Sequence, residues 1–150
     1  MAKFFYRMQN ILNIKYKLEE QAKQEFSQAL SRYQNETEKL ECLKSRKEMC
    51  ISEMREKAKE RLNVLELERC NESIAIFDEM IREQKEVVFR AMADMDRARA
   101  KLNEVMQERK THEKLKEHQF EAFLQELNVE EMKEIDQLVS YQHSIGKEGE

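Results

Sequence analysis

Hydrophobic residues recur at alternating steps of three and four along the second half of the chain. This row has one polar member, Gln84, and comprises Leu67, Cys70, Ile74, Phe77, Ile81, Gln84, Val88, Ala91, Met95, Ala98, Leu102 and Val105. A 3-4 spacing held over more than five heptads is typical of a coiled coil, because a repeat of 3.5 residues keeps one narrow row facing a partner helix. We name such a row the seam of its helix.

The first third of the chain carries a rougher row of the same kind. Its members are Phe4, Met8, Ile11, Lys15, Leu18 and Ala22, then Phe26, Leu30, Tyr33, Thr37 and Leu40, and finally Ile51, Met54 and Ala58. Steps of four between Ala22, Phe26 and Leu30 predict a stutter, which locally unwinds a supercoil. Each row is too narrow to be stable alone in water, so the two rows are expected to bury each other or equivalent rows on another chain.

The best candidate for a reversal of the chain lies between the two rows, in the stretch EKAKERLNVLELERCNES. Asn63 can cap the following helix, and Glu66 follows three residues later as in a capping box. Asn128 and Glu131 repeat this arrangement and offer a second possible break. We expect one coiled-coil domain over 1–145, with helix one over about 3–60, a turn at about 61–64 and helix two over about 65–143, followed by a disordered tail over 146–150.

Composition supports an all-α fold. The chain has no proline, its two glycines are Gly146 and Gly149, and 39 % of its residues are charged. β-Branched residues do not alternate with polar ones, so no strand is predicted. The predicted fold is therefore a long antiparallel two-helix coiled-coil hairpin, in which the numbers of paired residues add up to about 125.

This register makes the turn end and the open end of the hairpin differ in helix pairing, charge and apolar content. Beyond about residue 122, helix two has no partner within the chain, and this overhang is acidic, with Glu126, Glu130, Glu131, Glu134 and Asp136. Residues 107–119 have Leu115 as their only aliphatic side chain. We therefore expect the hairpin to be packed best near its turn and most loosely at its open end.

No reaction chemistry is predicted. The net charge of −4, with both signs interspersed, argues against binding to nucleic acid, and no apolar run is long enough to insert into a bilayer. Three cysteines without CxxC spacing fit a reducing cytosol. The histidines do not share a helix face, and no glycine-rich loop exists to bind phosphate. We expect no catalytic residue, no cofactor, no metal and no enzymatic activity.

Two groups of side chains are candidates for binding a protein partner. Apolar residues beside the seams form either a broader intramolecular interface or a docking face. Basic residues at the start of the chain are interleaved with aromatic ones, which leaves a membrane-surface helix open, although the 3-4 row favours the first turns of helix one. The candidate partner-binding residues are Leu43, Met49, Ile76, Phe77, Met80, Val87, Lys3 and Arg7.

Residues at the start, middle and end of the chain form a recognisable pattern. It begins with Phe5, Arg7, Met8, Gln9, Ile11 and Leu12, followed by Glu19 and Ala22. It continues at Phe77, Ile81 and Gln84, and ends at Glu131, Lys133, Glu134 and Asp136. In this pattern the chain resembles the FliJ family of flagellar export chaperones, with Gln137 where Glu is usual. The turn departs from the pattern, because RLNVL replaces the Gly or Pro of many relatives.

The resemblance implies an antiparallel two-helix coiled coil, similar to the rotor stalk of rotary ATPases. It implies a non-enzymatic, cytoplasmic component of the flagellar type III export apparatus, peripheral at the inner face of the cell membrane. The implied partners are the ring-shaped export ATPase, the membrane export gate protein and flagellar substrate chaperones. The alternative is a structural coiled coil that homodimerises through both seams, which would assemble in a concentration-dependent way.

Overall fold

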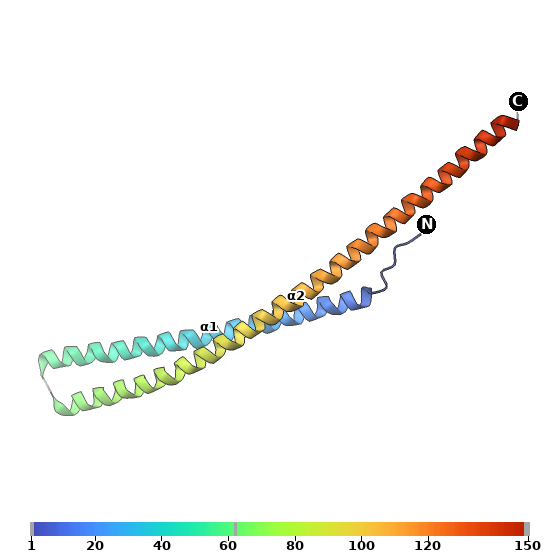
Figure 1. Ribbon diagram of the computed structural model, residues 1–150. Helices are drawn as coiled ribbons and strands as arrows, with labels where there is room; N and C mark the ends of the chain where they lie inside the picture. Colours follow the sequence, from blue (N-terminus) through green and yellow to red (C-terminus); the bar gives the residue numbers. More distant parts are fainter. Residues whose placement is uncertain (1, 62, 149–150) are drawn as a thin grey trace. The chain divides into compact units, whose positions relative to one another are not determined.

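Two long helices make up almost all of the protein. The computed structural model describes residues 2–61 and 63–148, and contains α1 (Gln9–Glu60) and α2 (Val64–Glu148), with no strand among the described residues (Figure 1). The helices contain 52 and 85 residues. The prediction of an all-α helical hairpin is confirmed.

The break between the helices lies where the sequence contains Asn63. The side-chain Oδ1 of Asn63 accepts a hydrogen bond of 3.2 Å from the backbone N–H of Leu65, which satisfies one of the free donors in the first turn of α2. Arg61 and Asn63 are not helical and Val64 already is, while Leu62 of the expected turn lies outside the described residues. α2 runs without a break through Asn128, so the second possible break is not used.

The outer ends of both helices differ from the expected bounds. α1 begins at Gln9 rather than near residue 3, because its first turn has no acidic residue and the preceding Lys3 and Arg7 are unfavourable beside the positive end of the helix dipole. α2 includes 146–148, which were expected to be disordered, while 149–150 lie outside the described residues. One glycine costs a helix about 1 kcal/mol relative to alanine, which is too little to end α2 at Gly146.

Packing divides the chain into two compact units. Unit 2 is Glu19–Glu104, and unit 1 combines Met1–Leu18 with Val105–Glu150. Each unit contains a stretch of α1 and a stretch of α2 that run antiparallel.

Contacts within unit 2 fix the register of its helices. Its inter-helix polar contacts are Lys101–Glu25 at 3.2 Å, Arg32–Asp94 at 3.8 Å, Gln84–Glu36 at 2.7 Å and Lys47–Asp78 at 2.5 Å. The residue numbers in these pairs add up to between 120 and 126, in agreement with the predicted register. The guanidinium of Arg99 also lies 5.6 Å from the ring centre of Phe26, within the range of a cation–π contact.

The predicted seam of α2 is confirmed. All twelve of its members, from Leu67 to Val105, are buried or half-buried, and Ile81, Ala91 and Met95 are the most buried of them. Gln84 is half-buried in line with its apolar neighbours.

The predicted seam of α1 is partly wrong. Ile11, Leu18 and Ala58 are exposed. The row that is buried or half-buried keeps an unbroken 3-4 spacing: Leu12, Lys15, Glu19, Ala22, Phe26, Ala29, Tyr33, Glu36, Leu40, Leu43, Lys47, Cys50 and Met54. The helix therefore needs no stutter. The pattern was obscured because four members of the row are charged.

The expected gradient of packing is also wrong. Between Leu40 and Ile81, none of the described residues is fully buried. In unit 1, by contrast, Tyr6 and Leu12 are only 4 % and 1 % exposed. The ring of Phe4 contacts Phe120 and Phe123, with centroids 5.1 and 5.5 Å apart. Aromatic side chains of the non-helical start therefore pack in unit 1, where Phe4 contacts α2 just beyond residues 107–119.

Candidate docking surfaces

Apolar side chains flank the seam of α2 near its start. Ile76 and Met80 are 60 % and 43 % exposed, and Val87 is half-buried. Leu65, which sequence reasoning did not select, is also exposed and lies eleven residues before Ile76, close to three whole helical turns. We name Leu65, Ile76, Met80 and Val87 the flank patch.

The other apolar candidates do not join this patch. Phe77 and Leu43 are half-buried members of the two seams. Met49 is exposed, and its helical spacing from Leu43 places it on the outward side of α1. The structure therefore separates the predicted apolar group into an exposed flank, two seam residues and one isolated methionine.

A second apolar surface runs along the end of α2 in unit 1. Every residue of 128–147 is exposed, including Met132, Ile135, Leu138 and Val139. At 100° per residue, the following six side chains occupy less than half of the helix circumference, and we name them the C-terminal stripe: Leu124, Met132, Ile135, Leu138, Val139 and Ile145. Sequence reasoning noted only the acidity of this segment, although steps of three and four from Met132 to Val139 carry the signal.

The basic residues at the start of the chain do not act as one group. Lys3 and Arg7 are exposed. The ammonium of Lys15 instead lies 2.9 Å from the carboxylate of Glu108, within unit 1. Only part of the predicted basic surface is therefore open to a partner.

Further polar contacts hold unit 1 together. Lys116 Nζ donates a hydrogen bond of 2.7 Å to Gln9 Oε1, and the Tyr16 hydroxyl donates one to the Glu113 carboxylate. Arg109 forms an ion pair of 2.9 Å with Glu113. These contacts occupy the stretch of α2 that has few aliphatic residues, so polar contacts replace seam packing there.

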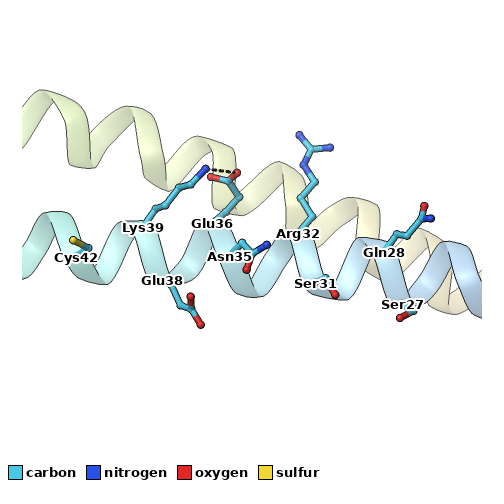
Figure 2. A pocket seen from close by; sticks show the side chains of 9 residues that line it. All are labelled: Ser27, Gln28, Ser31, Arg32, Asn35, Glu36, Glu38, Lys39 and Cys42. Carbon is cyan, nitrogen blue, oxygen red and sulfur yellow. Dashed lines mark hydrogen bonds and ion pairs between the residues drawn. The ribbon is translucent and has the colours of Figure 1, made fainter.

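Neither of two hollows in the surface resembles an active site. One, of about 740 Å³, runs along a single side of α1 in unit 2, and apart from the Glu36–Lys39 ion pair its side chains do not converge on a common point (Figure 2). Its lining is Ser27, Gln28, Ser31, Arg32, Asn35, Glu36, Glu38, Lys39 and Cys42. The other, of about 480 Å³, lies in unit 1 between Phe4, Leu12, Tyr16 and Phe120. Within 2–61 and 63–148, no three His, Cys, Asp or Glu side chains are grouped to hold a metal.

No helix in the described part of the chain has the length and apolar character needed to cross a membrane. The flank patch in unit 2 and the C-terminal stripe in unit 1 are two exposed groups of apolar side chains, each on one side of α2.

Comparison with known proteins identifies relatives along nearly the whole chain. A family model described as the flagellar FliJ protein matches residues 4–148. A flagellar FliJ protein of Bacillus subtilis (strain 168) is 29 % identical over 140 residues, covering 93 % of this chain and 95 % of that protein. A solved structure of a YscO homolog from Chlamydia trachomatis has a similar fold, with a TM-score of 0.66 and 20 % identity, covering 99 % of this chain and 100 % of that one.

Proposed function

This chain belongs to the flagellar FliJ family, and from that premise we propose that it is a non-enzymatic stalk of the flagellar type III export apparatus. In this proposal it connects the ring of the export ATPase with the membrane export gate protein and receives flagellar substrate chaperones. It acts in the cytoplasm, peripheral at the inner face of the cell membrane. The family match over 4–148 is the observation that carries the proposal.

The distribution of exposed apolar residues supports two separate docking sites. We assign the C-terminal stripe in unit 1, with Lys3 and Arg7, to the ATPase ring. The stripe lies mostly within 128–147, where every residue of α2 is exposed, and a narrow charged helical tip suits the pore of a ring, by resemblance to rotary stalks. We assign the flank patch in unit 2 to the export gate, and keep Leu43, Met49 and Phe77, which lie outside the patch, as further candidates for this contact. Exposed apolar surfaces of this kind commonly mark protein interaction sites.

A pull-down tests the proposal most simply. The tagged full-length chain should retain the purified export ATPase of the same cell, and the retention should weaken as salt rises if charged residues contribute. A chain that fails to retain the ATPase at low salt, while remaining helical by circular dichroism, would overturn the assignment to the export apparatus.

The competing function is that of a structural homodimer, in which the C-terminal stripes of two chains would pack against each other. Residues 126–136 carry five acidic side chains and one lysine, so two copies would repel each other across such a contact. We therefore expect sedimentation to give a monomer over a wide range of concentrations. A mass that doubles with concentration would favour the structural homodimer.

A further inference from the structure

A polar pair interrupts the apolar seams in the middle of unit 2. Gln84 occupies a seam position of α2, and Glu36 occupies a seam position of α1. The Gln84 Nε2 donates hydrogen bonds to the main-chain carbonyl of Glu36 at 2.9 Å and to its carboxylate Oε2 at 2.7 Å. The Glu36 side chain is only 16 % exposed. One amide thus satisfies two acceptors of a single residue on the opposite helix.

The apolar part of the seams does not select one register by itself. Both rows repeat every seven residues, so sliding one helix by a heptad again places apolar residues opposite apolar residues. Within unit 2 such a slide keeps most apolar residues opposite apolar residues, whereas in unit 1 it would displace the Lys15–Glu108 and Lys116–Gln9 contacts.

The connection between the helices constrains the register only weakly. Residues 55–61 and 63–66 are all exposed, so a helical turn on either side could unwind with little loss of buried surface. Lengthening a loop by a few residues adds little to the entropy cost of closing it, because this cost grows only with the logarithm of loop length. The inter-helix ion pairs in unit 2 also have partners that are about a third or more exposed, and exposed pairs of this kind contribute little.

We propose that the Glu36–Gln84 pair fixes the register of α1 against α2 within unit 2. A slide by one heptad places Glu36 opposite Phe77 or Ala91. It places Gln84 opposite Ala29 or Leu43. In either case a half-buried carboxylate and a half-buried amide face hydrocarbon, and each loses its partner. Single polar residues at seam positions are known to specify coiled-coil register in this way.

The electrostatics of the pair agree with this role. The hydrogen bond from Gln84 is the largest influence on the Glu36 carboxyl and lowers its pKa, and the positive charges of Lys39 and Arg32 act in the same direction. Figure 2 shows the ion pair between Glu36 and Lys39, which measures 3.4 Å. The carboxylate is therefore held in its charged form, which binds the amide most strongly.

Spin-label distances in the full-length chain test the proposal. Labels are placed on the exposed residues Gln34 and Arg90, after Cys42, Cys50 and Cys70 are replaced by alanine. This parent should show one narrow distance population. In the E36L/Q84L variant, a second population should appear, with one helix displaced by a heptad, about 10 Å along its axis. The ratio of shifted to unshifted chains should rise at least about tenfold. A hydrogen bond to a charged group commonly contributes enough free energy for a change of this size.

Two further variants separate register from stability. E36Q keeps an acceptor for the Gln84 amide and should keep the single population. E25A/K101A removes an exposed inter-helix ion pair and should also keep it. A single unshifted population in E36L/Q84L would overturn the proposal, as would a second population of equal size in E25A/K101A.

Discussion

Individual side chains of α1 are placed by their partners as much as by their own polarity. Leu12 is buried and Ile11 is exposed, although the two are almost equally apolar. Glu19 is 6 % exposed while Leu18 beside it is 40 % exposed. An apolar count along one helix cannot choose between such neighbours, because the choice is made by the side chains that α2 presents. This is why the seam of α2, with one polar member, was predictable and that of α1 was not.

Leu12→Ala should lower the free energy of unfolding by about 2–5 kcal/mol, because it leaves a cavity at a site that is 1 % exposed. Ile11→Ala is the matched control and should cost clearly less, since its side chain is 41 % exposed. Urea denaturation measures both. Equal losses for the two variants would contradict the corrected seam.

The pH dependence of stability should change when Glu36 is replaced by glutamine. The Glu36 pKa is lowered in the folded chain, so its contribution is present above the ordinary glutamate pKa and is lost as pH falls through the folded value. Lys39 and Arg32 face it from α1, and the neutral Gln84 amide faces it from α2.

E36Q should therefore be less stable than the parent at pH 7, and the difference should shrink below about pH 4. Thermal midpoints of both chains at pH 7 and pH 3 provide the measurement. Other carboxylates titrate in both chains and cancel in the comparison. A difference that is the same at both values of pH would exclude this role for the Glu36 carboxylate.

At the scale of elements, the existence and pairing of both helices followed from sequence, but their outer ends did not. The absence of proline and the 3-4 spacing predicted two helices, and Asn63 marked the break between them. The start of α1 was predicted too early because Phe4 and Met8 fit the 3-4 spacing. Phe4 instead lies before the helix, where its ring contacts Phe120 and Phe123. Spacing identifies which residues are apolar, but not whether the backbone between them is helical.

The last part of α2 should be much less protected from hydrogen exchange than its seam. All of 128–147 is exposed, and a helix without tertiary packing is marginally stable in water. Amide exchange followed by mass spectrometry should give fast exchange there and slow exchange over 74–102. Slow exchange over 128–147 in the isolated chain would show that this segment is already covered, as in a homodimer.

At the scale of the whole molecule, the sequence indicated the family and the class of function, and the structure adds where partners could bind. The resemblance at the start, middle and end of the chain agrees with a family match over 4–148. Only some of the docking residues that the sequence suggested are exposed in the structure. Ile76 and Met80 are exposed, whereas Phe77 belongs to a seam. The C-terminal stripe was missed because five acidic residues between 126 and 136 mask its apolar spacing.

We propose that the C-terminal stripe binds the export ATPase, and affinity measurements on full-length variants test this binding. I135E/L138E places two charges in the stripe, and I76E/M80E does the same in the flank patch as a matched control. We expect I135E/L138E, like removal of 125–150, to weaken ATPase binding at least about tenfold with little change in melting temperature, because central apolar contacts dominate interfaces. Undiminished binding by I135E/L138E, with loss of binding by I76E/M80E, would contradict it and move the ATPase contact to the flank patch.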